Sequence, residues 1–492
     1  MTLINCSVTP SGCRKARAGR VPPTPISILT SILFAILLLG DNAKATDWYV
    51  RPAAQGGATG KDWNNAWNIS GIAWGSVNAG DTIWLAGGSY SSGITVSASG
   101  AAGNPINIKK VLSSDSVPAH ASGWNSSFDS QVQLPGDTGI SIPSSSHIEI
   151  DGRIQYGILI KMPFAGGYGV ECDPGRGVGK PVTDLTFRNI DILGSYASVS
   201  NPAPAESVGF KIDPADSTLS GVLIDHCRIR GCATGLHCAI ANLTLQYSVL
   251  QDFAAAWGGA NGDHPDVMYC VPSPNMTWRY NTIINSESDG VFFEFGGAQN
   301  FQFYGNVYYG TTLSLMTFKN GGQTYGPIHI YNNTFHAPSA SNSGWITTDG
   351  SPMASGSSVY NNIFVNVANS MDHVASDYNA YNYTTLKGFA WPGPGGEGTE
   401  PHSITFSADP FVKVPPYTQP VATIGDFHLV SASQGAFQNG LPLAQDGFIN
   451  LDGDGNQRGT GGHWTIGAYQ YVAPGTPGAP APPTNLHIVG AK

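Results

Sequence analysis

The pattern of apolar and polar positions repeats along the middle of the chain. The repeated phrase has five residues and usually opens on glycine, after which apolar and variable positions alternate. Its copies start 24 to 40 residues apart: GVECD at Gly169, GFKID at Gly209, GLHCA at Gly235, DVMYC at Asp266, GVFFE at Gly290, LMTFK at Leu315 and GWITT at Gly344. The alternation predicts strands with one face toward a core. Such a period indicates a stack of small units that bury their apolar faces against each other.

A second phrase interleaves with the first and predicts corners between strands. In it two apolar alternations precede a polar turn, and another apolar pair follows, as in LTFRNIDI at Leu185. Asparagine tolerates left-handed backbone and bonds its own main chain. The predicted corners are Asn189, Asn281, Asn306, Asn333 and Asn362. Three strands per repeat then give an all-β fold, a right-handed parallel β-helix of about ten coils.

The ends of the chain differ in composition from this repeat. Four basic residues precede the apolar run 26–39, and Ala43-Lys44-Ala45 is typical of a signal-peptide cleavage site. The run is too short for a comfortable membrane span. We therefore expect cleavage near Ala45 and a monomeric protein, secreted or periplasmic or at the cell surface, with no membrane span. The predicted divisions are 1–45 signal peptide, 46–92 N-terminal cap, 93–375 β-helix, 376–472 β-rich C-terminal cap and 473–492 Pro/Gly/Ala-rich tail.

Charge and cysteine content narrow the classes of partner. The formal net charge is −10, and loss of the predicted signal peptide makes it more negative. Such a surface disfavours nucleic acid and anionic membranes. Five cysteines lie beyond residue 45, an odd number, so at least one thiol stays unpaired and the pairing of the rest is open: Cys172, Cys227, Cys232, Cys238 and Cys270.

The segment NLDGDGNQRG at Asn450 has the spacing of a calcium loop at its start. The twelfth position is Gly461 instead of glutamate, so the EF-hand pattern fails. We therefore predict a turn in which the aspartates bond backbone amides.

Several of these features together resemble a known family. The export signal, AGDTIWL followed by GNPINI, the asparagine corners and the closing DGDGNQR and IGAYQY are similar to secreted bacterial right-handed parallel β-helix proteins of the pectate lyase-like superfamily. The likeness spans about residues 46–472. It implies a polysaccharide partner but no single activity, because the superfamily includes lyases, hydrolases, epimerases and non-catalytic adhesins. The paired-aspartate and Gly-His-Gly motifs of polygalacturonases and the DPH motif of alginate epimerases are missing from the sequence.

Aligning the repeated phrases predicts two outward columns, in which neighbours are about 4.8 Å apart. One reads Glu171, Lys211, His237, Met268, Phe292, Thr317 and Ile346, and the other Asp173, Asp213, Ala239, Cys270, Glu294, Lys319 and Thr348. Alternating carboxylates and cations suit a sugar-binding groove, but a solvated sheet face with cross-strand ion pairs has the same pattern. Glu294 and Lys319 in particular favour a structural ion pair.

The candidate site draws on these columns and on the turn GGANGDHPDV. Lys211 and His237 would each disfavour the other's charged form and so act as bases, while the turn places a histidine between carboxylates that could instead bond turn amides. The predicted catalytic residues are Lys211, His237, His264 and Asp266, the substrate-binding residues Asp263, Phe292, Glu294 and Lys319, and the ligands of a possible Ca²⁺ Glu171, Asp173 and Asp213.

Three functions remain open at this stage. A lyase acting on uronate-containing glycans needs a cation for the sugar carboxylate and a base for the C5 proton, which the columns supply. A glycoside hydrolase needs two carboxylates, for which Asp213, Asp266 and Glu294 are candidates. A non-catalytic carbohydrate-binding or adhesive protein needs neither. The alternation of cations and carboxylates favours the lyase.

Overall fold

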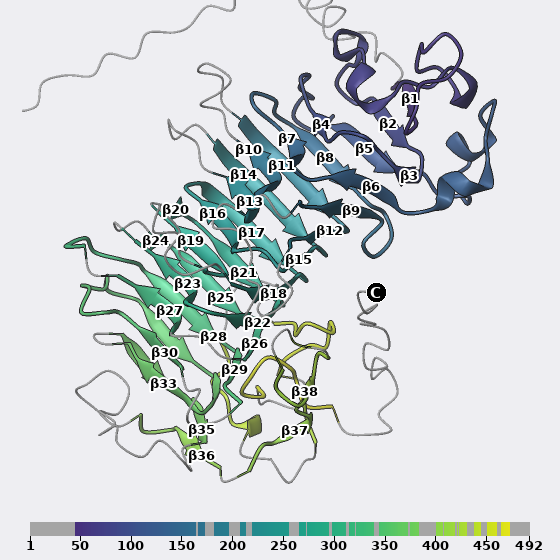
Figure 1. Ribbon diagram of the computed structural model, residues 1–492. Helices are drawn as coiled ribbons and strands as arrows, with labels where there is room; N and C mark the ends of the chain where they lie inside the picture. Colours follow the sequence, from purple (N-terminus) through teal and green to yellow (C-terminus); the bar gives the residue numbers. More distant parts are fainter. Residues whose placement is uncertain are drawn as a thin grey trace, which may run out of the picture. The chain divides into compact units, whose positions relative to one another are not determined.

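Three long parallel sheets run the length of the chain's central part (Figure 1). The computed structural model describes residues 45–163, 166–172, 182–195, 207–212, 219–254, 265–271, 273–294, 298–310, 314–319, 321–338, 344–371, 374–382, 400–406, 408–418, 421, 423–430, 437–443, 450–459 and 464–472. The predicted signal peptide and tail lie outside these residues, apart from Ala45. No helix among the described residues is long and apolar enough to cross a membrane.

Sheet A has twelve strands, all joined in parallel to their neighbours. They are, in spatial order, β1 (Asp47–Val50), β2 (Thr82–Leu85), β5 (Ile106–Lys110), β8 (Ile148–Asp151), β11 (Val182–Arg188), β14 (Leu219–Asp225), β17 (Ala241–Gln246), β21 (Thr277–Arg279), β25 (Phe301–Tyr304), β28 (Ile328–Tyr331), β31 (Ser358–Tyr360) and β34 (Ala375–Asp377). The first two strands come from the predicted N-terminal cap, so part of that segment is continuous with the sheet.

Sheet B also has twelve parallel strands, and all but the last, β36, follow a strand of sheet A after a corner or a longer connection. They are β3 (Gly88–Ser89), β6 (Val132–Pro135), β9 (Ile158–Lys161), β12 (Ile190–Leu193), β15 (Arg228–Arg230), β18 (Val249–Phe253), β22 (Thr282–Ser286), β26 (Val307–Tyr309), β29 (Thr334–His336), β32 (Ile363–Val365), β35 (Ala380–Asn382) and β36 (Ile404–Thr405).

Sheet C contains the repeated glycine phrase and has ten parallel strands. They are β4 (Ile94–Thr95), β7 (Thr138–Ser141), β10 (Gly167–Cys172), β13 (Ser207–Ile212), β16 (Thr234–Cys238), β19 (Met268–Cys270), β23 (Asp289–Phe293), β27 (Ser314–Phe318), β30 (Gly344–Thr347) and β33 (Val367–Ser370). In most coils the chain passes from sheet C to A to B and returns to C. The all-β parallel β-helix predicted from the repeat, with about ten coils, is therefore confirmed.

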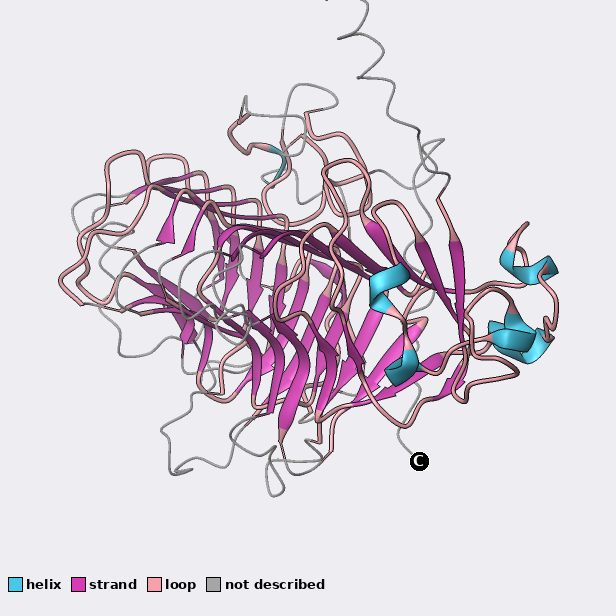
Figure 2. Cartoon of the chain, turned by 90° about the horizontal axis from the view of Figure 1, so that it is seen from above, coloured by secondary structure: helices cyan, strands magenta, loops and turns pink. Residues whose placement is uncertain are grey.

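The remaining elements are short. Two small pairs lie outside the three sheets, the parallel β20 (Ser273–Pro274) with β24 (Ala298–Gln299) and the antiparallel β37 (Phe411–Lys413) with β38 (Asp426–Leu429). The 3-10 helices η1 (Trp63–Asn65), η2 (Ile69–Gly71), η3 (Trp74–Ser76), η4 (Pro118–His120) and η5 (Ser126–Asp129) gather at the N-terminal end of the stack, where Figure 2 shows them beside the rows of strands. The described residues contain no α-helix.

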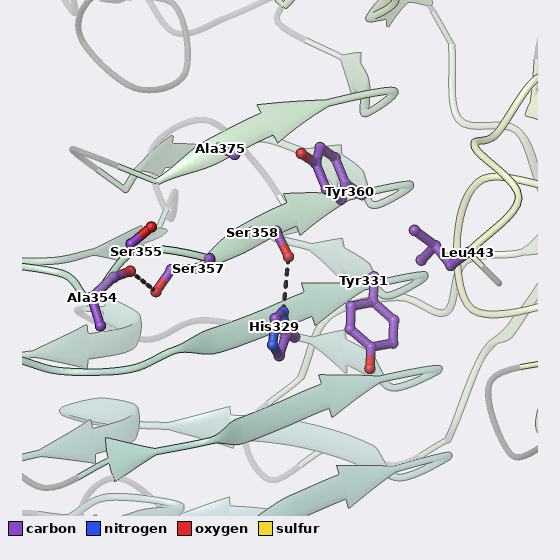
Figure 3. Close-up of a pocket in the computed structure, with 10 residues that line it drawn as sticks. His329, Tyr331, Ala354, Ser355, Ser357, Ser358, Tyr360, Ala375 and Leu443 are labelled. Atoms are coloured by element: carbon purple, nitrogen blue, oxygen red, sulfur yellow. Dashed lines mark hydrogen bonds between the residues drawn. The ribbon is translucent and has the colours of Figure 1, made fainter. Parts of the chain in front are cut away.

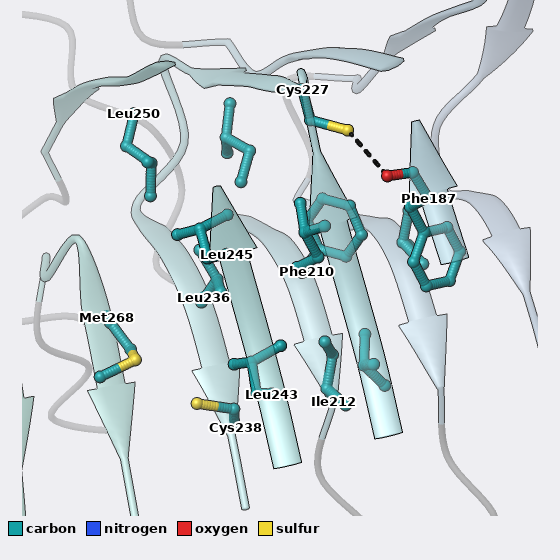
Figure 4. Close-up of a cluster of buried hydrophobic side chains, with 14 of the residues drawn as sticks. Phe187, Phe210, Ile212, Cys227, Leu236, Cys238, Leu243, Leu245, Leu250 and Met268 are labelled. Carbon is teal, nitrogen blue, oxygen red and sulfur yellow. Dashed lines mark hydrogen bonds between the residues drawn. The ribbon is translucent and has the colours of Figure 1, made fainter. Parts of the chain in front are cut away.

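The core fills the space between the three sheets with one layer of side chains per coil (Figure 4). Phe187 of sheet A meets Phe210 of sheet C with ring centroids 5.3 Å apart. On sheet B, Phe335, Phe364 and Tyr381 stack on successive strands at 5.2 Å. Because each coil alone is too thin to bury these rings, the stack is stabilised by contacts between neighbouring coils.

The cysteines belong to this core. All five are buried and reduced. Cys238 and Cys270 occupy the same register position on β16 and β19, with their sulfur atoms 3.3 Å apart. Stacked core thiols are thus what the structure contains.

At the corners between sheets A and B, two adjacent residues of the later coils share the role that we predicted for one asparagine. One has the left-handed backbone, and the next is an asparagine that bonds the neighbouring coil. Asn189 has the left-handed φ expected of a corner, +56°. In later coils the left-handed residue is the one before the predicted asparagine, as at Tyr280 and Asn332. The asparagines themselves are buried and join neighbouring coils. The backbone N–H of Asn281 donates to Asn306 Oδ1 at 2.9 Å, that of Asn306 to Asn333 Oδ1 at 2.9 Å, and that of Asn333 to Asn362 Oδ1 at 3.0 Å.

The predicted C-terminal region begins with β35 and β36, which continue sheet B, and its later described residues pack along the side of the stack. Phe411, Phe427 and Ile466 form an apolar cluster with Val307 and Tyr309 on the outer face of sheet B. The predicted turn in this region is confirmed. Asp452 accepts the backbone amides of Asp454 at 3.0 Å and Asn456 at 2.8 Å.

Candidate functional site

One outward column on sheet C brings together most of the predicted site residues that the structure describes. Glu171 on β10 pairs in register with Lys211 on β13, and Lys211 pairs with His237 on β16. The column continues through Tyr269, Phe292 and Thr317 on β19, β23 and β27. Adjacent strands in a sheet are about 4.8 Å apart, so a base, a cation and a hydroxyl donor lie within the length of one or two sugar rings.

Tyr269 stands where the sequence alignment had placed Met268. The phrase DVMYC was aligned on Asp266, but Leu236 pairs with Met268, so the register is one residue later. Met268 and Cys270 consequently point into the core and are fully buried. Ile346 is likewise a core residue, and Thr347 pairs with Thr317. These three assignments were wrong because glycine, aspartate and leucine each open a copy of the phrase, whereas only the alternating apolar positions fix its register.

The glycines that open the phrase are required by the core behind the column. A Cβ added at Gly209 would lie 2.4 Å from Ile229 Cγ2, and one at Gly235 would lie 2.9 Å from the Phe253 ring. Real Cβ atoms do not approach carbon so closely, so larger residues would push the strand outward. The glycine repeat therefore sets the path of sheet C directly beneath the candidate site.

Lys211 and His237 each contact an aromatic side chain. Lys211 Nζ lies 3.3 Å from the hydroxyl of Tyr168 and 4.7 Å from the centre of its ring. The His237 and Tyr269 rings meet edge to face, with centroids 5.1 Å apart. Among the described residues no carboxylate lies within ion-pair distance of Lys211. The two aromatic contacts position the Lys211 ammonium group and the His237 imidazole on the outer face of sheet C.

Tyr269 also connects the column to the predicted substrate-binding residues. Its hydroxyl donates to Glu294 Oε2 at 2.7 Å, and Lys319 Nζ contacts Glu294 Oε1 at 2.5 Å. The Tyr269 ring stacks on Phe292 with centroids 5.9 Å apart, and Lys319 lies 5.5 Å from the Phe292 ring centre. The structural ion pair foreseen for Glu294 and Lys319 is present, and it is coupled to a residue that the sequence reasoning missed.

Two buried carboxyl groups, those of Asp266 and Asp289, directly precede the positions at which the repeated phrase opens on sheet C. Asp266 is fully buried, and its Oδ1 accepts the backbone N–H of Asp289 at 3.0 Å. Asp289 in turn accepts the hydroxyl of Thr317 at 3.0 Å. Burial and then the negative charge of Asp289 raise the pKa of Asp266 well above its ordinary value. Asp266 therefore favours its protonated form and lies beneath the surface of the site.

Several predicted site residues cannot be placed. Asp173, Asp213, Asp263 and His264 lie outside the described residues. Of the three proposed calcium ligands only Glu171 is described, and it is 4 % exposed. Within the described ranges no group of three or more His, Cys, Asp or Glu side chains is arranged to hold a metal ion.

The chain was compared with protein-family models, curated protein sequences and solved structures, and similar proteins were found among the solved structures. No protein-family model and no curated protein sequence matches the chain. Similar solved structures include pectate lyase Pel9A (14% identity, TM-score 0.43, covering 87% of this chain and 97% of that one). A rhamnogalacturonan lyase has 11% identity and a TM-score of 0.40 over 61% and 83% of the two chains. The GH136 lacto-N-biosidase from Eubacterium ramulus has 10% identity and a TM-score of 0.38 over 72% and 71%.

These neighbours assign no activity to the chain, because identities this low show a fold alone. The parallel β-helix expected from the sequence is shown by the three parallel sheets of the structure itself.

Proposed function

We propose that the protein is a polysaccharide lyase that cleaves uronate-containing glycans by β-elimination. The observation that supports this most directly is the row Lys211, His237 and Tyr269 on three adjacent strands. β-Elimination removes the proton at C5, beside the sugar carboxylate, and expels the oxygen at C4. It needs a cation for the carboxylate, a base for the proton and a donor for the leaving oxygen.

The side chains of the row suit these three tasks. Imidazole is the side chain that exchanges a proton near neutral pH, so His237 is assigned as the base. Lys211, on the strand before it, pairs with the substrate carboxylate and stabilises the charge that develops as the C5 proton leaves. Tyr269, on the strand after it, is assigned as the acid: its one hydroxyl proton leaves the hydrogen bond to Glu294 for the C4 oxygen, and the proton that His237 takes from C5 replaces it through solvent. Phe292 is 4 % exposed, so its ring supports Tyr269 and Lys319 from behind, and Lys319 contacts the next sugar unit.

The undescribed residues keep their proposed roles. His264 remains a second candidate for the acid, and Asp263 for substrate binding. Calcium held by Glu171, Asp173 and Asp213 would supply further positive charge to an acidic protein surface. Since two of its three ligands lie outside the described residues, no step of the mechanism depends on it. Action outside the cell, following from the predicted signal peptide, and a monomeric state belong to the same proposal.

A glycoside hydrolase is the second candidate, and one observation favours it. The raised pKa of Asp266 is the property that a general acid needs. However, Asp266 is 0 % exposed, and Glu294 is already bonded to Tyr269 and Lys319. We therefore propose that Asp266 acts through Asp289, as a positioning residue beneath the site.

Incubation of the protein with acidic and neutral polysaccharides tests the proposal. We expect an ultraviolet-absorbing unsaturated product from a uronate polymer, lost about 10²- to 10⁴-fold in His237→Gln. New reducing ends without that absorbance would indicate a hydrolase, and no product from any polymer would favour the non-catalytic, carbohydrate-binding alternative. Lyase activity that persists in the presence of a chelator would contradict the calcium part alone.

A further inference from the structure

A pocket lies on the outer face of sheet A, on a different sheet from the candidate site. It has a volume of about 440 Å³ and is formed by the last coils and one residue of the C-terminal region (Figure 3). Strands β28 and β31 supply His329, Tyr331, Ser358 and Tyr360. The connection before β31 supplies Ser355 and Ser357, and Leu443 closes one side. The volume is within the range of pockets that hold small organic ligands.

The polar groups of this pocket carry no formal charge. The described residues of its lining include serines, tyrosines and one histidine, and none of these described residues is a lysine, arginine, aspartate or glutamate. His329 Nδ1 and Ser358 Oγ are 3.0 Å apart, so they orient each other. Burial lowers the pKa of His329 and favours the neutral imidazole. The nearest carboxylate in register, Asp377 beside Tyr360, is bonded to His402 Nδ1 at 2.8 Å.

Tyr331 and Tyr360 belong to a column of outward side chains that occupy the same register position on successive strands of sheet A. The charge of this column changes along the sheet. In earlier coils it holds charged and amide side chains, including Arg188, Asp225 and Arg279. From β25 to β31 it holds Tyr304, Tyr331 and Tyr360, and on β34 it ends on Asp377. Tyr331 packs on Tyr304 and is almost fully buried, whereas Tyr360 is only half-buried. The pocket therefore combines a partly exposed aromatic ring with neutral hydrogen-bonding groups.

We infer that this pocket binds an uncharged sugar residue. Aromatic rings pack against the C–H faces of pyranose rings, and serine, histidine and tyrosine groups bond sugar hydroxyls. A uronate would bury its carboxylate there without a counter-charge, which is costly. The ligand class thus differs from the one proposed for sheet C, where lysines are present. The inference does not depend on the protein being a lyase.

Binding of neutral oligosaccharides tests this inference. The probes are xylo-, gluco- and galacto-oligosaccharides of four to six units, with oligogalacturonate as the charged comparison, and affinity is measured by calorimetry on the full chain. We expect at least one neutral probe to bind, and Tyr360→Ala and His329→Gln to weaken it about tenfold or more. Ser358→Ala is the milder variant, and it keeps the strand intact if the larger changes lower stability.

Tyr247→Ala provides the matched control, because Tyr247 is a half-buried tyrosine near the same outer face that does not line the pocket. It should leave binding unchanged. None of the pocket variants should alter product formation from a uronate polymer, which separates this inference from the proposed function. The inference is overturned if no neutral probe binds below about 10 mM, if the pocket variants bind like the wild type, or if oligogalacturonate binds in this pocket equally well.

Discussion

The outer faces of sheets A and C have similar sequence patterns and different contacts. On sheet A the charges satisfy one another across strands. Lys109 contacts Glu149 at 3.4 Å, Arg188 contacts Glu149 at 3.2 Å, and Arg188 also contacts Asp225 at 3.1 Å. On sheet C, Lys211 instead lies against Tyr168 and beside His237. An ion pair between neighbouring strands stabilises the fold. A cation that packs against an aromatic ring can still bind a negatively charged ligand.

This comparison answers a question that the sequence left open. Alternating carboxylates and cations were consistent with either a sugar-binding face or a face of cross-strand ion pairs. The second description fits sheet A. On sheet C it fits Glu294 with Lys319, and that pair is connected through Tyr269 to the column of candidate catalytic residues.

The largest expected difference between the two faces is in activity. Lys211→Met should reduce lyase turnover about 10²- to 10³-fold, because it removes the charge that faces the substrate carboxylate. Arg188→Met removes a cation of the same charge from sheet A. It should leave turnover unchanged and cost at most about 1 kcal/mol of stability, since Arg188 is in part-exposed ion pairs. Initial rates and urea denaturation of both variants provide the measurement.

Equal loss of turnover in the two variants would mean that Lys211 supports the fold as Arg188 does. An unchanged rate in Lys211→Met would remove Lys211 from the mechanism while leaving His237 and Tyr269 to be examined.

A second difference lies in the backbone, because sheet C passes close to the core at its glycines. Gly209→Ala should lower stability by about 1–3 kcal/mol, since the added methyl would lie 2.4 Å from Ile229 Cγ2 and 2.6 Å from the carbonyl oxygen of Gly235. Gly75→Ala is the control, because no atom lies within 4 Å of its added Cβ. It should be neutral or slightly stabilising. If both variants melt alike, the glycines of the repeat have no steric role.

The repeat explains how far the sequence could predict the fold and the site. Apolar alternation is enforced by burial over every coil, so it identified the sheets and placed Glu171, Lys211 and His237 on one face. It could not fix the register of β19, because the phrase of that strand has no glycine and was aligned on Asp266, whereas the pairing of Met268 with Leu236 depends on core packing. Tyr269 was missed for that reason.

Other errors came from contacts between distant segments. The side chain of Asn306 was expected at a corner for its backbone freedom, yet it is buried and bonds neighbouring coils. The docking of Phe427 and Ile466 on sheet B depends on apolar surface that local patterns do not reveal.

The smallest and most specific contrast concerns two aspartates whose pKa values shift in opposite directions. On sheet A, burial alone would raise the pKa of Asp225, but hydrogen bonds from His226, Gln246 and Arg188 outweigh it and hold the pKa below its ordinary value of 3.8. Asp225 therefore contributes stability that is present above about pH 4 and is lost as the pH falls through its folded pKa. Asp225→Asn should have a lower melting temperature than the wild type at pH 7, and the difference between the two melting temperatures should become smaller at acidic pH.

Asp266, beneath sheet C, should behave in the opposite way. Its raised pKa means that the folded protein holds the proton more tightly than the unfolded chain, so its contribution is fully present below about pH 3.8 and is lost as the pH rises through the folded pKa. Asparagine mimics the protonated acid and can keep the bond from the Asp289 amide. Asp266→Asn should therefore match the wild type near pH 4 and melt above it at pH 7. A variant that instead loses stability at pH 7 would show that Asp266 is ionised in the fold. If Asp266→Asn lost lyase turnover without any change in melting temperature, Asp266 would be the catalytic acid, contrary to what its burial indicates.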